Sequence, residues 1–82
     1  MTEVEKENLN SMREILLVAI HREEEAYAFY IGARQCARTP HEVEMFNRLA
    51  AQEMQHKRAL EIQLEEINNQ LDMDRALSYD IS

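Results

Sequence analysis

The chain is poor in residues that interrupt helices or cross-link a fold. Its 82 residues include one glycine, one proline, one cysteine and no tryptophan. A single cysteine excludes an internal disulfide, and so gives no sign of an oxidising compartment. The longest apolar runs, such as residues 15–20, are far shorter than the roughly 20 residues that span a bilayer, so we expect no membrane partner.

Basic residues are outnumbered by acidic ones, 9 to 16, and the net charge is −7. A nucleic-acid partner would need a basic patch to meet its phosphates, so this charge argues against one and favours cations instead. The acidic N-terminal residues lack the basic and then apolar layout of a secretion signal. We therefore expect a cytoplasmic protein.

Glutamate, alanine, leucine, arginine and glutamine dominate what is present, and this composition predicts an all-α fold. The length predicts one small domain over residues 1–82. A chain of this size rarely gains more than about 3–5 kcal/mol from its own core. We therefore expect a metal or a partner chain to contribute to its stability.

A first helix is predicted over residues 11–38, after a frayed N-terminal segment, residues 1–10. Ser11 and Glu14 have the spacing of a capping box that opens a helix. From there the residues of one seam recur in steps of four and three, which is the pattern of a helix packed along another helix. The seam consists of Met12, Leu16, Ala19, Glu23, Ala26, Tyr30, Ala33 and Ala37.

A second helix is predicted over residues 40–70. Thr39 supplies an N-cap and Pro40 a suitable first helical residue. Its seam consists of Phe46, Leu49, Glu53, His56, Leu60, Leu64, Ile67 and Leu71. Residues 72–82 are expected to form a tail with one short helical turn.

The short connection between the two predicted helices requires them to fold back as an antiparallel hairpin. Each helix also carries isoleucine beside its seam, at Ile15, Ile20 and Ile62, which one hairpin cannot cover. We therefore expect two hairpins to pair, as a homodimer or within a higher homo-oligomer, and to form a four-helix bundle.

Three ionisable residues interrupt the apolar seams: Glu23 on the first helix, and Glu53 and His56 on the second. Turning these groups into a core is costly unless something binds them. The Glu-x-x-His spacing puts Glu53 and His56 on one helical face. A dimer would offer four carboxylates and two imidazoles, the set that binds two metals in ferritin-like bundles. The alternative is a polar pair that only fixes the register of a structural bundle.

Two segments carry a resemblance to a known family. Residues 19–30 and residues 46–56 resemble one half of a rubrerythrin or ferritin-like domain. Full domains of that kind carry the half twice, whereas this chain carries it once. It is similar in this respect to the encapsulated ferritins, half-length relatives that dimerise and oxidise iron inside a protein nanocompartment. The resemblance covers residues 12–67.

The resemblance implies a ligand set and a cofactor. It assigns Glu23, Glu53 and His56 as iron ligands, with two irons in each dimer. It also places Tyr30 beside the metal, as the tyrosine that follows the first ligand by seven residues.

Two departures from the encapsulated ferritins limit what carries over. Those proteins tend to have acidic residues on both sides of the first ligand, which form an outer iron site; here Glu25 fits and Arg22 does not, and Phe29 replaces a bulkier aromatic residue. Residues 75–82 also lack an obvious encapsulation signal. The tail therefore does not support a shell protein as partner. The sequence could equally be the N-terminal half of a longer ferritin-like protein.

The leading functional hypothesis is an iron-binding, ferroxidase-like protein that oxidises Fe(II) to Fe(III) with O₂ at a di-iron site shared by two chains. Iron storage would require a larger assembly. One alternative is peroxide reduction of the rubrerythrin type, which normally uses a cysteine-rich electron-delivery domain that one cysteine cannot provide. The other is a non-catalytic helical oligomerisation module, which has no use for three ionisable residues on its seams.

Overall fold

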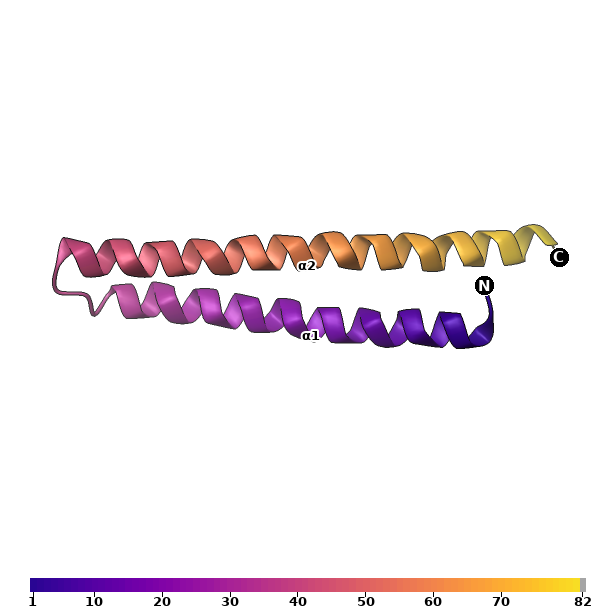
Figure 1. The fold of residues 1–82 in the computed structure, drawn as a ribbon, viewed down its shortest axis with the longest axis horizontal. Helices are drawn as coiled ribbons and strands as arrows, with labels where there is room; N and C mark the ends of the chain where they lie inside the picture. Colours follow the sequence, from indigo (N-terminus) through magenta and orange to yellow (C-terminus); the bar gives the residue numbers. More distant parts are fainter. Residues whose placement is uncertain (82) are drawn as a thin grey trace.

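The computed structural model describes residues 1–81, and the side chains of residues 1–77, as two long helices. α1 runs from Glu3–Arg34 and α2 from Pro40–Ile81, and the described residues contain no strand. Figure 1 shows the two helices side by side and antiparallel, joined by one short turn. The predicted all-α class is therefore confirmed, in the form of a two-helix hairpin.

The hairpin is a thin rod. It measures 65 × 16 × 13 Å and has a radius of gyration of 18.7 Å. A compact chain of this length would have a radius of gyration of about 12 Å. Two helices side by side thus extend the chain instead of enclosing an interior.

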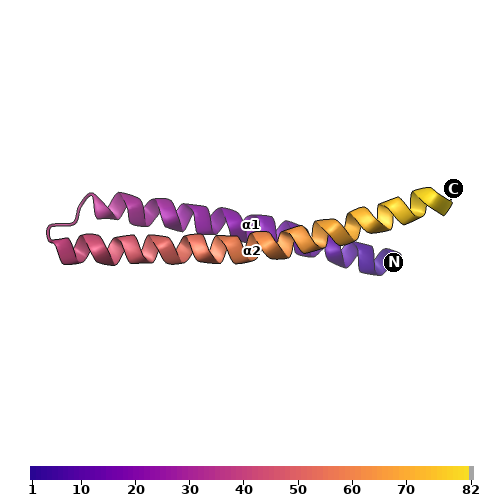
Figure 2. The same ribbon diagram turned by 90° about the horizontal axis from the view of Figure 1, so that it is seen from above.

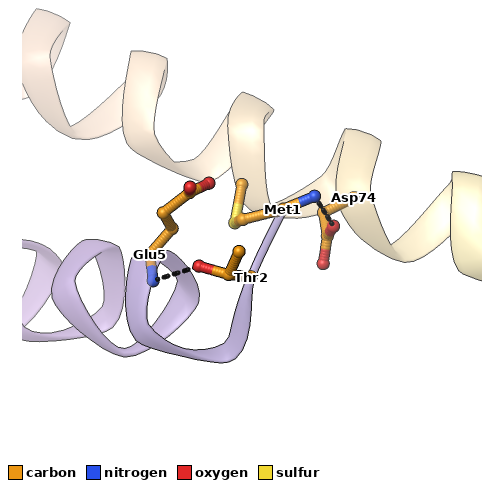
Figure 3. A network of polar contacts seen from close by, with 4 residues as sticks. All are labelled: Met1, Thr2, Glu5 and Asp74. Carbon is orange, nitrogen blue, oxygen red and sulfur yellow. Dashed lines mark hydrogen bonds and ion pairs between the residues drawn. The ribbon is translucent and has the colours of Figure 1, made fainter.

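α1 begins earlier than predicted. Thr2 is its N-cap, and the Thr2 hydroxyl accepts a hydrogen bond of 3.1 Å from the backbone N–H of Glu5 (Figure 3). Acidic residues in the first turn also interact favourably with the helix dipole. The prediction of a frayed segment over residues 1–10 is wrong, because Thr2 offers the N-cap chemistry that we assigned to Ser11. Ser11 itself lies inside α1.

An ion pair at the same end of the hairpin joins the first residue of the chain to α2. The terminal amino group of Met1 lies 3.6 Å from the Asp74 carboxylate of α2. Figure 3 shows this ion pair beside the Thr2 cap. The contact therefore ties the start of α1 to the C-terminal part of α2.

α1 ends at Arg34, four residues before the predicted end of the first helix. Beyond it, the backbone N–H groups of residues 35–37 donate to carbonyl groups three residues earlier, as in a tightened last turn. Pro40 disfavours helical backbone at the preceding residue, Thr39. The chain must therefore leave α1 before Thr39.

The predicted start of the second helix is confirmed at Pro40. The hydroxyl of Thr39 accepts a hydrogen bond of 3.2 Å from the backbone N–H of Glu42. The Glu42 carboxylate in turn accepts one of 2.8 Å from the backbone N–H of Arg38. These reciprocal bonds satisfy groups that a helix start leaves without partners.

α2 does not end near residue 70 but continues to Ile81, so the prediction of a separate tail over residues 72–82 is wrong for its described part. The reason is that no glycine or proline follows Pro40, and Asn68 and Asn69 cost a helix little compared with those residues. Figure 2 shows the C-terminal part of α2 diverging from α1. Residue 82 and the side chains of residues 78–81, which include most of the stretch searched for an encapsulation signal, lie outside the described residues.

The hairpin has almost no core of its own. Among the described apolar side chains, two are buried: Ala50, 2% exposed, and Ile67, 6% exposed. Many large apolar side chains stay exposed, among them Ile15, Val18 and Phe29. Within the part of the chain that was searched, neither helix has a stretch apolar and long enough to cross a membrane.

Candidate metal centre

The middle of the hairpin brings together the three residues singled out from the sequence. Glu23 comes from α1, and Glu53 and His56 come from α2; each offers one possible ligand atom, and these atoms lie within 4.8 Å of one another. Nδ1 of His56 lies 3.7 Å from Oε2 of Glu23 and 3.6 Å from Oε2 of Glu53. The antiparallel helices therefore place the three groups at one level, as predicted. The seam position of His56 is wrong, because His56 is exposed and Lys57 is the half-buried residue at this level of α2. The role of the three residues as ligands stays a prediction.

Small residues make room for these groups between the helices. Ala50 precedes Glu53 by about one turn of α2 and is almost fully buried. Ala19 and Ala26 lie about one turn before and after Glu23 on the same face of α1, and both are half-buried. Larger side chains at these positions would compete with the carboxylates for space between the helices.

The two carboxylates lie inside the interface, whereas the imidazole lies at its edge. The side chains of Glu53 and Glu23 are 18% and 23% exposed, and that of His56 is 61% exposed. Oε2 of Glu23 is buried and has no hydrogen-bond partner. A buried polar atom without a partner costs stability, and such atoms are uncommon in folded proteins.

The pKa of Glu23 is raised above its ordinary value. The main cause is Glu53, to which a protonated Glu23 can donate a hydrogen bond; burial and the negative charge of Glu53 act in the same direction, and His56 acts against them. Two ionised carboxylates can only accept hydrogen bonds, so they cannot satisfy each other. With both carboxyls ionised, the centre would therefore be under electrostatic strain that a cation would relieve.

The donor set fits a divalent transition metal. Two carboxylates and an imidazole are ligands that iron and its neighbours accept. Two ligands that each lie about 2.1 Å from one ion can be up to about 4 Å apart. The separations of 3.6 and 3.7 Å fall within that range, and a cation would give the buried oxygen of Glu23 the partner that it lacks.

Tyr30, the predicted metal-proximal residue, is half-buried on α1 about two turns beyond Glu23. Its ring packs edge to face on the ring of Phe29, with a centroid distance of 5.5 Å. Helical side chains lean toward the N-terminus, which directs that of Tyr30 back toward the level of Glu23. The metal-proximal role of Tyr30 stays a prediction.

The sequence analysis missed a contact beside this centre. The ammonium of Lys57 donates a hydrogen bond of 3.3 Å to the carboxylate of Glu24 across the two helices. Each residue directly follows a predicted ligand, Glu23 or His56, so the register of the hairpin could have revealed the pair. Glu25, considered for an outer iron site, instead lies 2.8 Å from Nε2 of His21 on the surface of α1.

A comparison with known protein families identifies the family of the chain. The family model described as rubrerythrin matches residues 14–79, a span that includes the three clustered residues and most of both helices. The chain belongs to the rubrerythrin family. Rubrerythrin-family proteins bind iron, and their domains typically oligomerise. This confirms the family resemblance stated from the sequence, while the narrower similarity to encapsulated ferritins stays a prediction. A search of curated proteins and a search of solved structures gave no match to this rubrerythrin-family chain.

Proposed function

We propose that the chain is a ferroxidase-like protein that oxidises Fe(II) to Fe(III) with O₂. The site would be shared by two chains, each of which contributes Glu23, Glu53 and His56. The observation that carries this proposal is the buried, unpartnered Oε2 of Glu23, which lies 3.7 Å from His56 in a chain of an iron-binding family. Iron is the substrate as well as the bound metal.

The proposed roles of the residues follow from their charge and position. Four carboxylates from two chains match the charge of two Fe(II) ions, and neutral imidazoles complete the donor set. Glu23 is the residue we expect to bridge the two irons, because it comes from the opposite helix to the other two ligands. A carboxyl or imidazole must lose its proton to bind a metal, so iron binding should release protons.

Two features favour a site shared between chains. One chain supplies three clustered ligands, with His56 largely exposed at the edge of the interface. One hairpin also leaves large apolar side chains exposed, and pairing two hairpins in a four-helix bundle would cover them. The stoichiometry we propose is two irons per dimer.

The proposed reaction balances without a further reductant. Each of two Fe(II) ions gives one electron, and O₂ takes two electrons and two protons to leave as H₂O₂. Glu23 and Glu53 hold the substrate ions next to each other, which favours removal of both electrons in one encounter. Tyr30 would act from nearby, as a hydrogen-bond donor to one of these carboxylates.

An anaerobic titration with Fe(II), followed by admission of air, tests the proposal. We expect saturation at two irons per dimer and, on adding air, ferric absorption in the near ultraviolet with one O₂ consumed for each pair of irons. A protein that binds iron but reacts faster with H₂O₂ than with O₂ would support the peroxide-reducing alternative. A protein that binds no Fe(II) would contradict both and leave the helical oligomerisation module.

A further inference from the structure

A charged pair crosses from one helix to the other beside the candidate metal centre. Lys57 on α2 and Glu24 on α1 lie 3.3 Å apart, nitrogen to oxygen. Outside the centre itself, the other ion pair that joins the two helices among the described residues is at the far end of the hairpin, between Met1 and Asp74. The remaining described pairs, such as Glu44 with Arg48, lie within one helix.

The position of this pair follows from helix geometry. Each step along an α-helix turns the side chain by about 100°. Glu24 is one step beyond Glu23, and Lys57 is one step beyond His56. Because the two helices are antiparallel, both steps turn toward the same flank of the hairpin. The pair therefore closes one flank of the centre, and His56 is exposed on the other.

The exposure of the side chains agrees with a closed flank at Lys57 and an open flank at His56. Lys57 is 23% exposed, against 61% for its neighbour His56. Ala50, the most buried of the described side chains, precedes Lys57 by two turns on the same face of α2. The helices thus approach closely on the flank of Lys57, whose aliphatic stem packs there while its ammonium reaches Glu24.

A second cross-helix contact has the same register. The guanidinium of Arg34 donates a hydrogen bond of 2.7 Å to the side-chain oxygen of Asn47. Arg34 lies as many residues after Glu24 as Asn47 lies before Lys57. Both contacts are therefore made by one alignment of the helices, and a slip of either helix would break both.

We propose that Glu24 and Lys57 are positioning residues that hold α1 and α2 in the register at which Glu23 meets Glu53 and His56. The inference rests on the proposed function, since it assigns these three residues as metal ligands. An exposed ion pair adds little to overall stability. Its effect here is on the alignment of α1 with α2, because each member of the pair lies one residue from a proposed ligand on its helix.

Metal affinity in variants of unchanged net charge tests this role. The variant Glu24→Gln/Lys57→Met removes the pair, and Glu24→Lys/Lys57→Glu reverses it; both keep the net charge of the parent. The matched control Glu44→Gln/Arg48→Met removes a pair of the same charges within α2. Co²⁺ serves as the probe, because O₂ does not oxidise it under these conditions and its visible absorption reports the ligand set.

We expect the variant without the pair to bind Co²⁺ roughly 2- to 10-fold more weakly than the parent. The reversed pair should restore the affinity to within about twofold, and the control should stay within about twofold. An effect of net charge alone would leave the first variant unchanged. The proposal is wrong if that variant binds like the parent, if the reversed pair binds no better than it, or if the control loses as much.

A second measurement separates this proposal from the proposed function. In the metal-free protein, the nuclear Overhauser effect between the His56 ring and the Glu23 side chain reports the register directly. It should weaken in Glu24→Gln/Lys57→Met and return with the reversed pair. If the parent bound no Co²⁺, the proposed metal site would fail, yet this measurement would still decide the role of Glu24 and Lys57.

Discussion

The turn of the hairpin and its middle differ in how far their polar groups are satisfied by hydrogen bonds. At the turn, Thr39 and Glu42 exchange hydrogen bonds with the backbone, and Arg34 bonds to Asn47 across the helices. In the middle, Glu23 has a buried oxygen without a partner and a carboxyl with a raised pKa. The same two helices therefore contain one region that satisfies its polar groups and one that leaves them in need of a ligand.

The difference shows where stability and function are separated in this chain. Local consistency of caps and hydrogen bonds is what specifies a fold, and natural proteins depart from it at functional sites. The turn needs nothing from outside the chain. The middle is energetically incomplete, which is why changes in the two regions should have different effects.

The largest expected effect is on iron oxidation. Glu53→Ala and His56→Ala should each lower the initial rate of Fe(II) oxidation by at least about 10- to 100-fold. That is the typical cost of losing a residue that only supports a metal ligand. The metal-free fold should persist, because removing Glu53 also removes repulsion from Glu23. Stopped-flow absorption of the ferric product measures the rate, with the exposed neighbour Gln55→Ala as control. An unchanged rate in either variant would remove that residue from the site.

The next effect is a link between metal binding and dimerisation. If half of the ligands come from each chain, a metal that binds only the dimer must favour it by mass action. At a free-metal concentration of 100 times Kd, the stabilisation should reach about 2.7 kcal/mol. Native mass spectrometry and thermal unfolding with and without Co²⁺ measure the two sides of this link.

His56→Ala is the control for this link, since it should dimerise no better with Co²⁺ than without. A parent protein that stayed monomeric both with and without the metal would contradict the shared site. The centre would then have to be completed within one chain.

A change at the turn should affect stability alone. Thr39→Ala removes the N-cap of α2 and should lower the free energy of unfolding by about 1 kcal/mol. The number of irons bound per chain should not change, because the cap is far from Glu23 along the hairpin. Thermal unfolding and metal analysis check the two parts, and Thr39→Ser should restore most of the stability. Loss of iron from the folded Thr39→Ala variant would show that the two regions are coupled.

The contrast between the two regions also explains what the sequence could predict. The start of α2 was predictable because Thr39, Pro40 and Glu42 carry specific capping chemistry. The meeting of Glu23 with Glu53 and His56 was predictable because three ionisable residues fell on otherwise apolar seams. In both cases the residues that carry the pattern lie close together in the sequence or at matching positions on the two predicted seams.

Elsewhere the local pattern had two explanations, or did not by itself identify the contact. Thr2 and Ser11 offer the same N-cap chemistry, so the start of α1 depended on whether the preceding residues could be helical. The second helix was predicted to end at residue 70, yet the helix propensity of Asn68, Asn69 and the residues that follow was sufficient for α2 to continue. The pairing of Lys57 with Glu24 depends on the register of the two helices, which single-helix periodicity does not contain.

The smallest effect we predict is a pH dependence of stability that belongs to Glu23. Its pKa is raised in the folded protein, so its neutral form is the one that folding favours. The associated stability is fully present below the ordinary value of 4.5 and is lost as the pH rises through the raised pKa. Glu23→Gln stays neutral and can still donate a hydrogen bond to Glu53. The metal-free variant should therefore gain stability over the parent as the pH rises.

Thermal unfolding of both metal-free proteins from pH 4 to pH 8 measures this gain as a difference in Tm. The difference should be smallest at the acid end, rise with pH, and level off above the raised pKa of Glu23. We expect the change to be modest, because His56 partly opposes the rise in pKa. Glu61→Gln, at an exposed position of α2, is the matched control and should show no such rise. A flat or falling difference for Glu23→Gln would mean that the two carboxylates do not strain the metal-free centre, and the case for a cation between them would lose its electrostatic support.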